Sequence, residues 1–138
     1  MFGLSGDLTG LSAEAIARVR QHIDFYKQWR EFIRGASAYL LSPICSIDDR
    51  ASWIAFQLQN PSEPKTALVF VYRLLDGLSH NSFRLRDLDI TQIYTVTNID
   101  TPNSPQLVYG LELHSFGLKV DQPHPNSAAI FIIQFSDD

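Results

Sequence analysis

Apolar residues recur at three- and four-residue steps near the start of the chain. Ile16, Val19, Ile23 and Tyr26 follow this spacing, which places their side chains on one face of an α-helix. Four further apolar residues widen that face: Phe25, Trp29, Phe32 and Ile33. The pattern predicts one helix of about twenty residues, with an apolar surface broader than a single packing contact needs.

Residue types at both ends of this pattern are typical of helix termini. The hydroxyl of Thr9 or Ser12 can accept hydrogen bonds from the free N–H groups of the first turn, where Glu14 also suits the positive end of the helix dipole. Gly35 follows Arg34 and is expected to stop the helix by adopting the left-handed backbone conformation. The helix should therefore end close to residue 35.

After Gly35 the spacing changes to two-residue alternation and short apolar runs separated by turn residues. It predicts eight strands, at residues 38–41, 53–59, 67–74, 82–85, 92–97, 107–109, 118–120 and 128–135. Short strands that recur about every ten residues are typical of antiparallel sandwiches. We expect a mainly-β protein, with a Greek-key-like antiparallel β-sandwich over residues 36–138, preceded by one long α-helix.

Two of the predicted strands differ in their patterning. Residues 128–135 read "AAIFIIQF" and are apolar on both faces, which predicts a central strand. Residues 53–59 read "WIAFQLQ" and predict a strand with one face nearer to water. On that strand one set of side chains alternates with the other: Trp53, Ala55, Gln57 and Gln59 against Ile54, Phe56 and Leu58.

Composition narrows the classes of function. At 138 residues the chain is long enough to bury a core within a single domain. A net charge of -4 provides no general positive field for phosphate backbones or acidic lipids, so nucleic acid is not an expected partner. No apolar run is long enough to predict a membrane span. The lone Cys45 cannot form an internal disulfide, which favours the reducing cytoplasm.

The polar residues do not form a recognisable reactive motif. The four histidines lack the short spacing of a preformed metal site: His22, His80, His114 and His124. The carboxylate pairs Asp48/Asp49 and Asp87/Asp89 lie in polar turns, where aspartate commonly accepts hydrogen bonds from its own backbone. We therefore predict no catalytic residue, no metal and no cofactor.

Aromatic residues leave a sugar-binding function open. Pyranose rings have apolar C–H faces that can lie against exposed indole or phenol rings. The candidates for such a platform on the sheet are Trp53, Tyr72, Tyr94 and Tyr109. Large aromatic residues of a sandwich more often belong to its core, and the sequence does not choose among the four.

Several long segments of the sequence resemble motifs of a known enzyme family. "FGLSGDLTGLSAEAIARVRQHIDFYKQWREFIRGASAYLLSP" resembles the end of the catalytic barrel and the start of the C-terminal domain in family-36 glycoside hydrolases, the α-galactosidase and melibiase type. The family's "DL-x-x-LS-x-E", "I-x-FYK-x-x-R-x-x-I" and "YxL-x-P" segments match here in order, with Gly6 directly before the first of them. Later, "WIAFQLQNPSEPKTALVFVYRL", "FRLRDLDITQIYTVTN" and "YGLELHSFGLKV" are similar to the family's strand elements, so the resemblance covers nearly the whole chain.

The resemblance implies that residues 1–35 are the last loop and helix of a truncated (β/α)8 barrel and that residues 36–138 are a C-terminal accessory domain. The family's two catalytic aspartates stand in "KWD" and "SGG" motifs that this sequence lacks. The chain alone is therefore expected to be inactive, with the missing barrel as its partner and α-galactosides as substrates of the parent protein. A free-standing carbohydrate-binding module is the alternative.

The resemblance also places Ser5, Gly6 and Asp7 near the barrel rim, where they are expected to contact an α-galactoside sugar. A simple turn that enters the helix is the competing interpretation for Asp7.

The broad apolar face of the helix has a further consequence. Without a barrel to cover it, we expect the chain to form a homodimer through the N-terminal helix. Folding of the helix against its own sandwich is the competing outcome.

Overall fold

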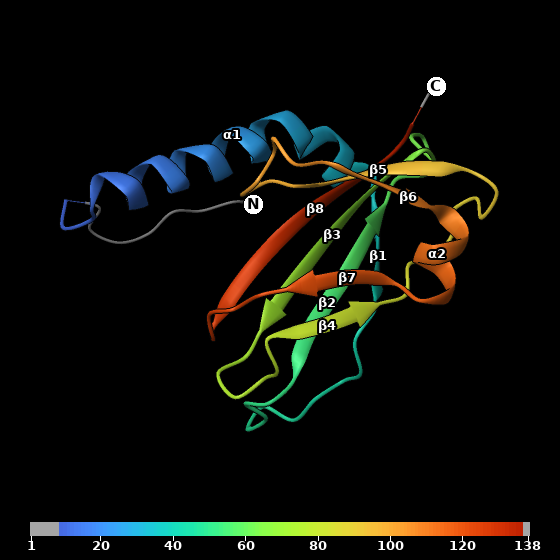
Figure 1. The fold of residues 1–138 in the computed structure, drawn as a ribbon. Coiled ribbons are helices and arrows are strands. Elements are labelled where there is room, and N and C mark those ends of the chain that lie inside the picture. The colour runs from blue at the N-terminus through green and yellow to red at the C-terminus, as the bar shows by residue number, and fades with distance from the viewer. Residues whose placement is uncertain (1–8, 137–138) are drawn as a thin grey trace. The chain divides into compact units, whose positions relative to one another are not determined.

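The computed structural model describes residues 9–136, and the chain divides after Gly35 into two compact units (Figure 1). The first unit contains helix α1, Ala13–Gly35. Ser12 caps it: the Ser12 hydroxyl accepts a hydrogen bond from the Ala15 N–H at 3.2 Å. Arg34 lies in the last turn, as expected.

Gly35 ends α1 without the left-handed conformation that we predicted. Among the described residues, the glycine with positive φ is Gly117 (φ 89°). The chain runs from Gly35 into the extended strand that begins at Ser37, so no left-handed reversal is needed at this helix end.

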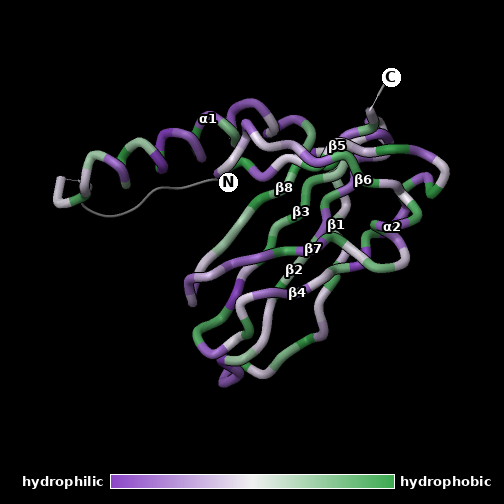
Figure 2. Tube along the Cα trace, viewed as in Figure 1, coloured by the Kyte–Doolittle hydropathy of each residue, from purple (hydrophilic) through white to green (hydrophobic). Residues whose placement is uncertain are grey.

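The apolar face of α1 is partly buried. Trp29 and Phe32 are buried and their rings meet edge to face, with centroids 5.6 Å apart. Ile16, one helical turn from the start, remains exposed. Apolar and polar residues alternate along α1 as the helical spacing predicts (Figure 2).

The second unit is built on a six-stranded antiparallel sheet in the order β1-β2-β3-β8-β5-β6 (Figure 1). Its strands are β1 Ser37–Leu40, β2 Trp53–Gln59, β3 Thr66–Arg73, β5 Ile93–Asn98, β6 Gln106–Tyr109 and β8 Ser127–Phe135. β8 lies between β3 and β5, so the prediction that "AAIFIIQF" forms a central strand is confirmed. β1 and β6 are the two edges.

A smaller layer completes the sandwich. β4 (His80–Phe83) and β7 (Leu118–Asp121) pair as a two-stranded sheet that Figure 1 shows crossing one face of the larger sheet. Helix α2, Gly110–Ser115, follows β6 directly. The core lies between the two layers and includes Trp53, Ala55, Val69, Val71, Phe83, Leu85, Tyr94, Leu113, Val120 and Ile133. The predicted mainly-β sandwich with one N-terminal helix is confirmed.

The large sheet has two unlike faces. We call the side that contacts the small layer the inner face and the opposite side the outer face. Alternation along the strands places seven large apolar side chains on the outer face: Ile54, Phe56, Leu58, Phe70, Tyr72, Ile130 and Ile132. These side chains are half-buried or exposed, whereas Leu68 on the same face is fully buried.

The prediction that β2 has one face nearer to water is confirmed, and that face carries Ile54, Phe56 and Leu58 rather than the glutamines. Gln57 and Gln59 lie on the inner face and are buried. The Gln57 side-chain amide donates to the Arg86 carbonyl at 2.8 Å and accepts from the Arg86 N–H at 2.9 Å. The Gln59 amide donates to the carbonyls of Pro64 and Thr66. These hydrogen bonds satisfy the two amides and offset the cost of removing them from water.

Candidate functional site

The predicted sugar contacts Ser5, Gly6 and Asp7 lie outside the residues that the structure describes. Their role therefore stays a prediction. Within residues 9–136, the features that could bind or act on a ligand are the carboxylates, the cavities and the exposed aromatic rings of the sandwich.

Two of the turn aspartates are bound by their own loops. The Asp49 carboxylate accepts from the Ala51 N–H at 2.9 Å and from the Ser52 hydroxyl, and the Ser52 bond contributes most to lowering the pKa of Asp49. Asp89 accepts from the Thr91 hydroxyl at 2.7 Å and the Thr91 N–H at 2.9 Å, which lowers its pKa in the same way. The turn interpretation of Asp49 and Asp89 is confirmed.

These carboxylates are unsuited to proton donation. A glycosidase acid needs a raised pKa so that it holds a proton near neutral pH. Asp49 and Asp89 are shifted in the opposite direction. The Asp87 carboxylate instead accepts a hydrogen bond from the Tyr39 hydroxyl, which raises the pKa of that phenol. The Asp87 backbone has the left-handed conformation (φ 55°), which aspartate tolerates.

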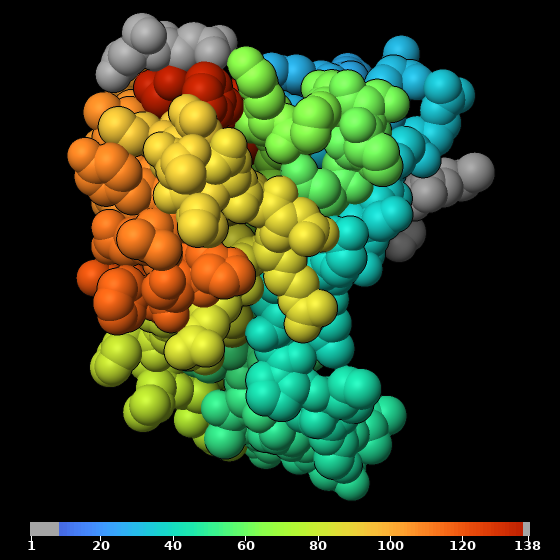
Figure 3. All heavy atoms as spheres, turned by 90° about the vertical axis from the view of Figure 1, so that its right-hand side faces the viewer, coloured from blue at the N-terminus to red at the C-terminus, as the bar shows by residue number. Residues whose placement is uncertain are grey.

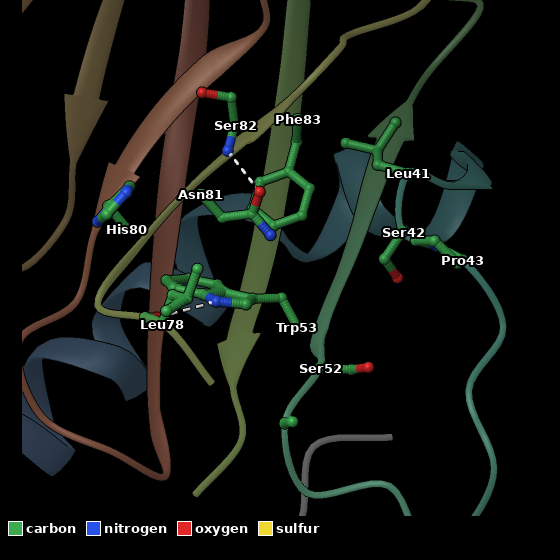
Figure 4. A pocket seen from close by; sticks show the side chains of 11 residues that line it. Leu41, Ser42, Pro43, Ser52, Trp53, Leu78, His80, Asn81, Ser82 and Phe83 are labelled. Carbon is green, nitrogen blue, oxygen red and sulfur yellow. Dashed lines mark hydrogen bonds between the residues drawn. The ribbon is translucent and has the colours of Figure 1, made fainter. Parts of the chain in front are cut away.

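A cavity of about 350 Å³ opens between the end of β1 and the start of β4. Figure 4 shows Ser42 and Pro43 on one side of it and the Trp53 indole with Leu78 on the other. The indole N–H donates to the Leu78 carbonyl at 3.1 Å, and the Ser42 hydroxyl accepts from the Ala55 N–H at 3.1 Å. The cavity's lining contains hydroxyls, an amide and the imidazole of His80 but no carboxylate, so it holds no pair of acids for glycoside hydrolysis.

The four aromatic candidates for a sugar platform separate into two groups. Tyr94 is buried in the core, and Trp53 is a core residue that shows only a small part of its indole to the cavity beside β4. Tyr72 is partly exposed on the outer face, where the Phe56 ring stacks on Phe70 at 4.9 Å between centroids and on Tyr72 at 6.3 Å. Stacked rings cover one another's faces, which reduces the surface that a pyranose could use. Tyr109 is 61% exposed, the largest exposed fraction among the four candidates.

Tyr109 borders a shallow apolar groove of about 570 Å³ beside β6. We call it the β6 groove; its lining is Ile90, Tyr109, Leu111, Glu112, Phe116 and Lys119. Figure 3 shows α2 and the residues after it (orange) at the surface next to the segment around β5 (yellow). The groove carries one acidic and one basic residue around an apolar centre.

The sequence reading did not predict α2 or this groove. The signal that could have found them is the glycine at each end of "GLELHSFG". A Cβ on Gly110 would lie 2.2 Å from the Asp89 carbonyl oxygen, and Gly117 combines a positive φ with a close approach to Phe83. Both glycines allow a short helix to fit tightly between neighbouring backbones.

Two classes of feature were not found among residues 9–136. No group of three or more His, Cys, Asp or Glu side chains is placed to hold a metal ion within this part of the chain. Likewise, no helix in the described region has the length and apolar character required to cross a membrane.

Comparison by sequence finds no matching protein-family model and no matching curated protein. Comparison by structure finds α-galactosidases. The galactosidase domain of the α-galactosidase-sucrose kinase AgaSK is 22% identical, with a TM-score of 0.72 over 92% of this chain and 17% of that one. The α-galactosidase of Lactobacillus brevis is 20% identical, with a TM-score of 0.70 over 96% of this chain and 18% of that one.

The family-36 α-galactosidase AgaA of Geobacillus stearothermophilus, in complex with 1-deoxygalactonojirimycin, is 20% identical, with a TM-score of 0.73 over 94% of this chain and 17% of that one. The predicted resemblance to the C-terminal region of these enzymes is confirmed at the level of the fold. The chain spans less than a fifth of the length of the enzymes it matches.

Proposed function

We propose that the chain is the C-terminal accessory domain of an α-galactosidase-type glycoside hydrolase. The observation that carries this proposal is the coverage: a fold that includes nearly all of this chain accounts for about 17% of the matched α-galactosidases. In the parent protein, residues 1–35 complete a (β/α)8 barrel and residues 36–138 form the sandwich beside it. The catalytic aspartates belong to the part outside this chain, and the parent hydrolyses α-galactosides in the cytoplasm.

The outer face of the large sheet supports an accessory role. Apolar side chains on one sheet face are stable in a soluble protein when another layer covers them, and large exposed apolar patches mark interaction sites. Phe56, Phe70 and Tyr72 form a stacked aromatic row on this face. We infer that the rest of the parent enzyme packs against this row.

The size of the native protein tests the proposal. An antibody raised against this chain should recover from the source cells a polypeptide several times longer, and peptide mass spectrometry should find the "KWD" and "SGG" motifs in it. A native product of 15.6 kDa would contradict the proposal.

An activity assay on the purified chain adds a second test. We expect no release of nitrophenol from p-nitrophenyl α-galactoside, because the proposed catalytic aspartates lie outside this chain and turn hydrogen bonds lower the pKa values of Asp49 and Asp89. Hydrolysis that survives extensive purification would overturn the inactive accessory role. In crystals of the full-length parent soaked with galactose, a contact to Ser5, Gly6 or Asp7 would support their predicted role, and an empty environment around them would remove it.

A carbohydrate-binding module is the second candidate, and the exposure of Tyr109 beside the β6 groove favours it. Galactose, melibiose and raffinose are titrated into the chain by calorimetry. If the module interpretation holds, Tyr109→Ala abolishes the heat and the control Tyr72→Ala does not. Absence of heat at about 10 mM sugar, a concentration well above ordinary millimolar affinities, would eliminate it.

A further inference from the structure

The edge strand β6 lacks the protection that most exposed strand edges have. Natural edge strands usually carry charged residues, proline or bulges that oppose pairing with another chain. β6 reads "QLVY", and its Leu107 and Tyr109 side chains are 66% and 61% exposed. The strands of the small sheet carry charged or titratable residues instead, with Lys119 and Asp121 on β7 and His80 on β4. β6 is thus an uncharged, exposed edge that is open to pairing.

The hydrogen-bonding direction of β6 follows from its register with β5. Ile93 lies opposite Tyr109, and the Gly110 N–H donates to the Gln92 carbonyl at 2.7 Å. Because bonded and non-bonded pairs alternate in an antiparallel ladder, Gln106 and Val108 direct their backbone groups toward β5. Leu107 and Tyr109 direct theirs toward the open edge. The Tyr109 carbonyl is engaged separately, because Tyr109 is the N-cap of α2 and accepts the first helical hydrogen bond.

We propose that β6 pairs antiparallel with β6 of a second copy of this chain, about a two-fold axis beside Leu107. Each Leu107 N–H then donates to the Leu107 carbonyl of the other copy, and each Tyr109 N–H donates to the other copy's Pro105 carbonyl. In this register, two backbone groups of each copy make no hydrogen bond to the other copy. They are the Pro105 nitrogen, which has no hydrogen, and the Tyr109 carbonyl, which already serves α2.

Side chains at the edge are self-complementary in this register. Residues two apart lie on the same side of a strand, so Leu107 meets Leu107 and the Tyr109 ring meets Pro105. The adjacent β6 groove contributes one acid, Glu112, and one base, Lys119, so two copies meet without accumulating net charge. A four-residue edge is smaller than the roughly 800 Å² per partner of a standard interface, so the dimer is weak and reversible.

Sedimentation equilibrium of the whole chain tests the proposal between about 10 μM and about 1 mM, the range in which a weak dimer is resolved. Leu107→Pro removes the central N–H without touching the β5 ladder, and Leu107→Lys places a charge at the edge. Each variant should weaken the dimer by at least about tenfold. The control Leu78→Lys alters a similarly exposed leucine in the loop before β4 and should leave the dimer unchanged.

Amide hydrogen exchange gives a site-specific reading of the same event. As concentration rises, the N–H groups of Leu107 and Tyr109 should gain protection, while that of Val108, already bonded to β5, should change little. A monomer throughout the range would overturn the proposal. A dimer that persists in both folded Leu107 variants would also overturn it. The same holds for a dimer that dissociates only when Ile23 and Tyr26 are both changed to Asp, because that dimer would form through the helix.

Discussion

The two faces of the six-stranded sheet show that polarity along a strand does not by itself decide which face is buried. On β2, the inner face carries Gln57 and Gln59, and both are buried. The outer face carries Ile54, Phe56 and Leu58, and all three are only half-buried. On β2, burial follows from which face the β4–β7 layer covers, and the buried amides are tolerated because each has hydrogen-bond partners.

Matched substitutions on adjacent residues of β8 should produce the largest difference between the faces. Ile133 points to the inner face and is fully buried, whereas Ile132 points to the outer face and is half-buried. We expect Ile133→Ala to lower the free energy of unfolding by about 3–4 kcal/mol and Ile132→Ala by about 1 kcal/mol. Urea unfolding measures both, and equal losses would mean that the two faces are equally well packed.

Removal of the Gln57 amide should be the next largest effect. Gln57→Leu keeps the volume approximately but leaves the N–H and carbonyl of Arg86 without their partner. We expect a loss of about 2–3 kcal/mol in the free energy of unfolding, the cost of unsatisfied buried polar groups. A neutral or stabilising result would show that water replaces the amide, and the inner face would then be less dry than its burial indicates.

On the outer face, a polar substitution should change surface behaviour more than stability. Phe56→Ser removes the middle ring of the stack with Phe70 and Tyr72. We expect a loss of about 1–2 kcal/mol, below the range for fully buried phenylalanine, together with weaker binding of a hydrophobic dye. Unchanged dye binding in a folded variant would show that the row is not an accessible apolar surface.

The smallest effect should come from a loop that belongs to neither face. Hydrogen bonds from Ser52 and Ala51 lower the pKa of Asp49, so ionised Asp49 stabilises the fold above the ordinary carboxyl pKa of about 4. That contribution is lost as pH falls through the lowered pKa. Asp49→Ala should therefore be less stable than the native chain near neutral pH, and the gap should narrow in acid. Urea midpoints measured across this range check the sign, and a gap that widens in acid would contradict it.

Local patterns in the sequence predicted most of the elements. Helical spacing with Ser12 before it located α1, and two-residue alternation located all eight strands to within a few residues. The turn roles of Asp49 and Asp89 followed from their neighbours, since aspartate bonds to nearby backbone N–H groups.

Features set by distant contacts were not predicted. The inner position of Gln57 depends on the backbone of Arg86, which lies far along the chain. Likewise α2 begins where Gly110 lies close against the backbone of Asp89, and the exposure of Tyr109 compared with Tyr94 depends on the strand order. Periodicity reports which residues share a face, but it does not report what covers that face.

The place of β8 in the sheet affects how the protein is made. β8 follows every other strand along the chain, yet it joins β3 to β5 and thereby connects the two halves of the large sheet. During synthesis, β1, β2 and β3 can pair as they leave the ribosome, while β5 and β6 form a separate hairpin. The open edge of β3 then waits for a strand more than fifty residues downstream. Nascent chains paused before β8 should therefore be the form most exposed to aggregation and most dependent on chaperones.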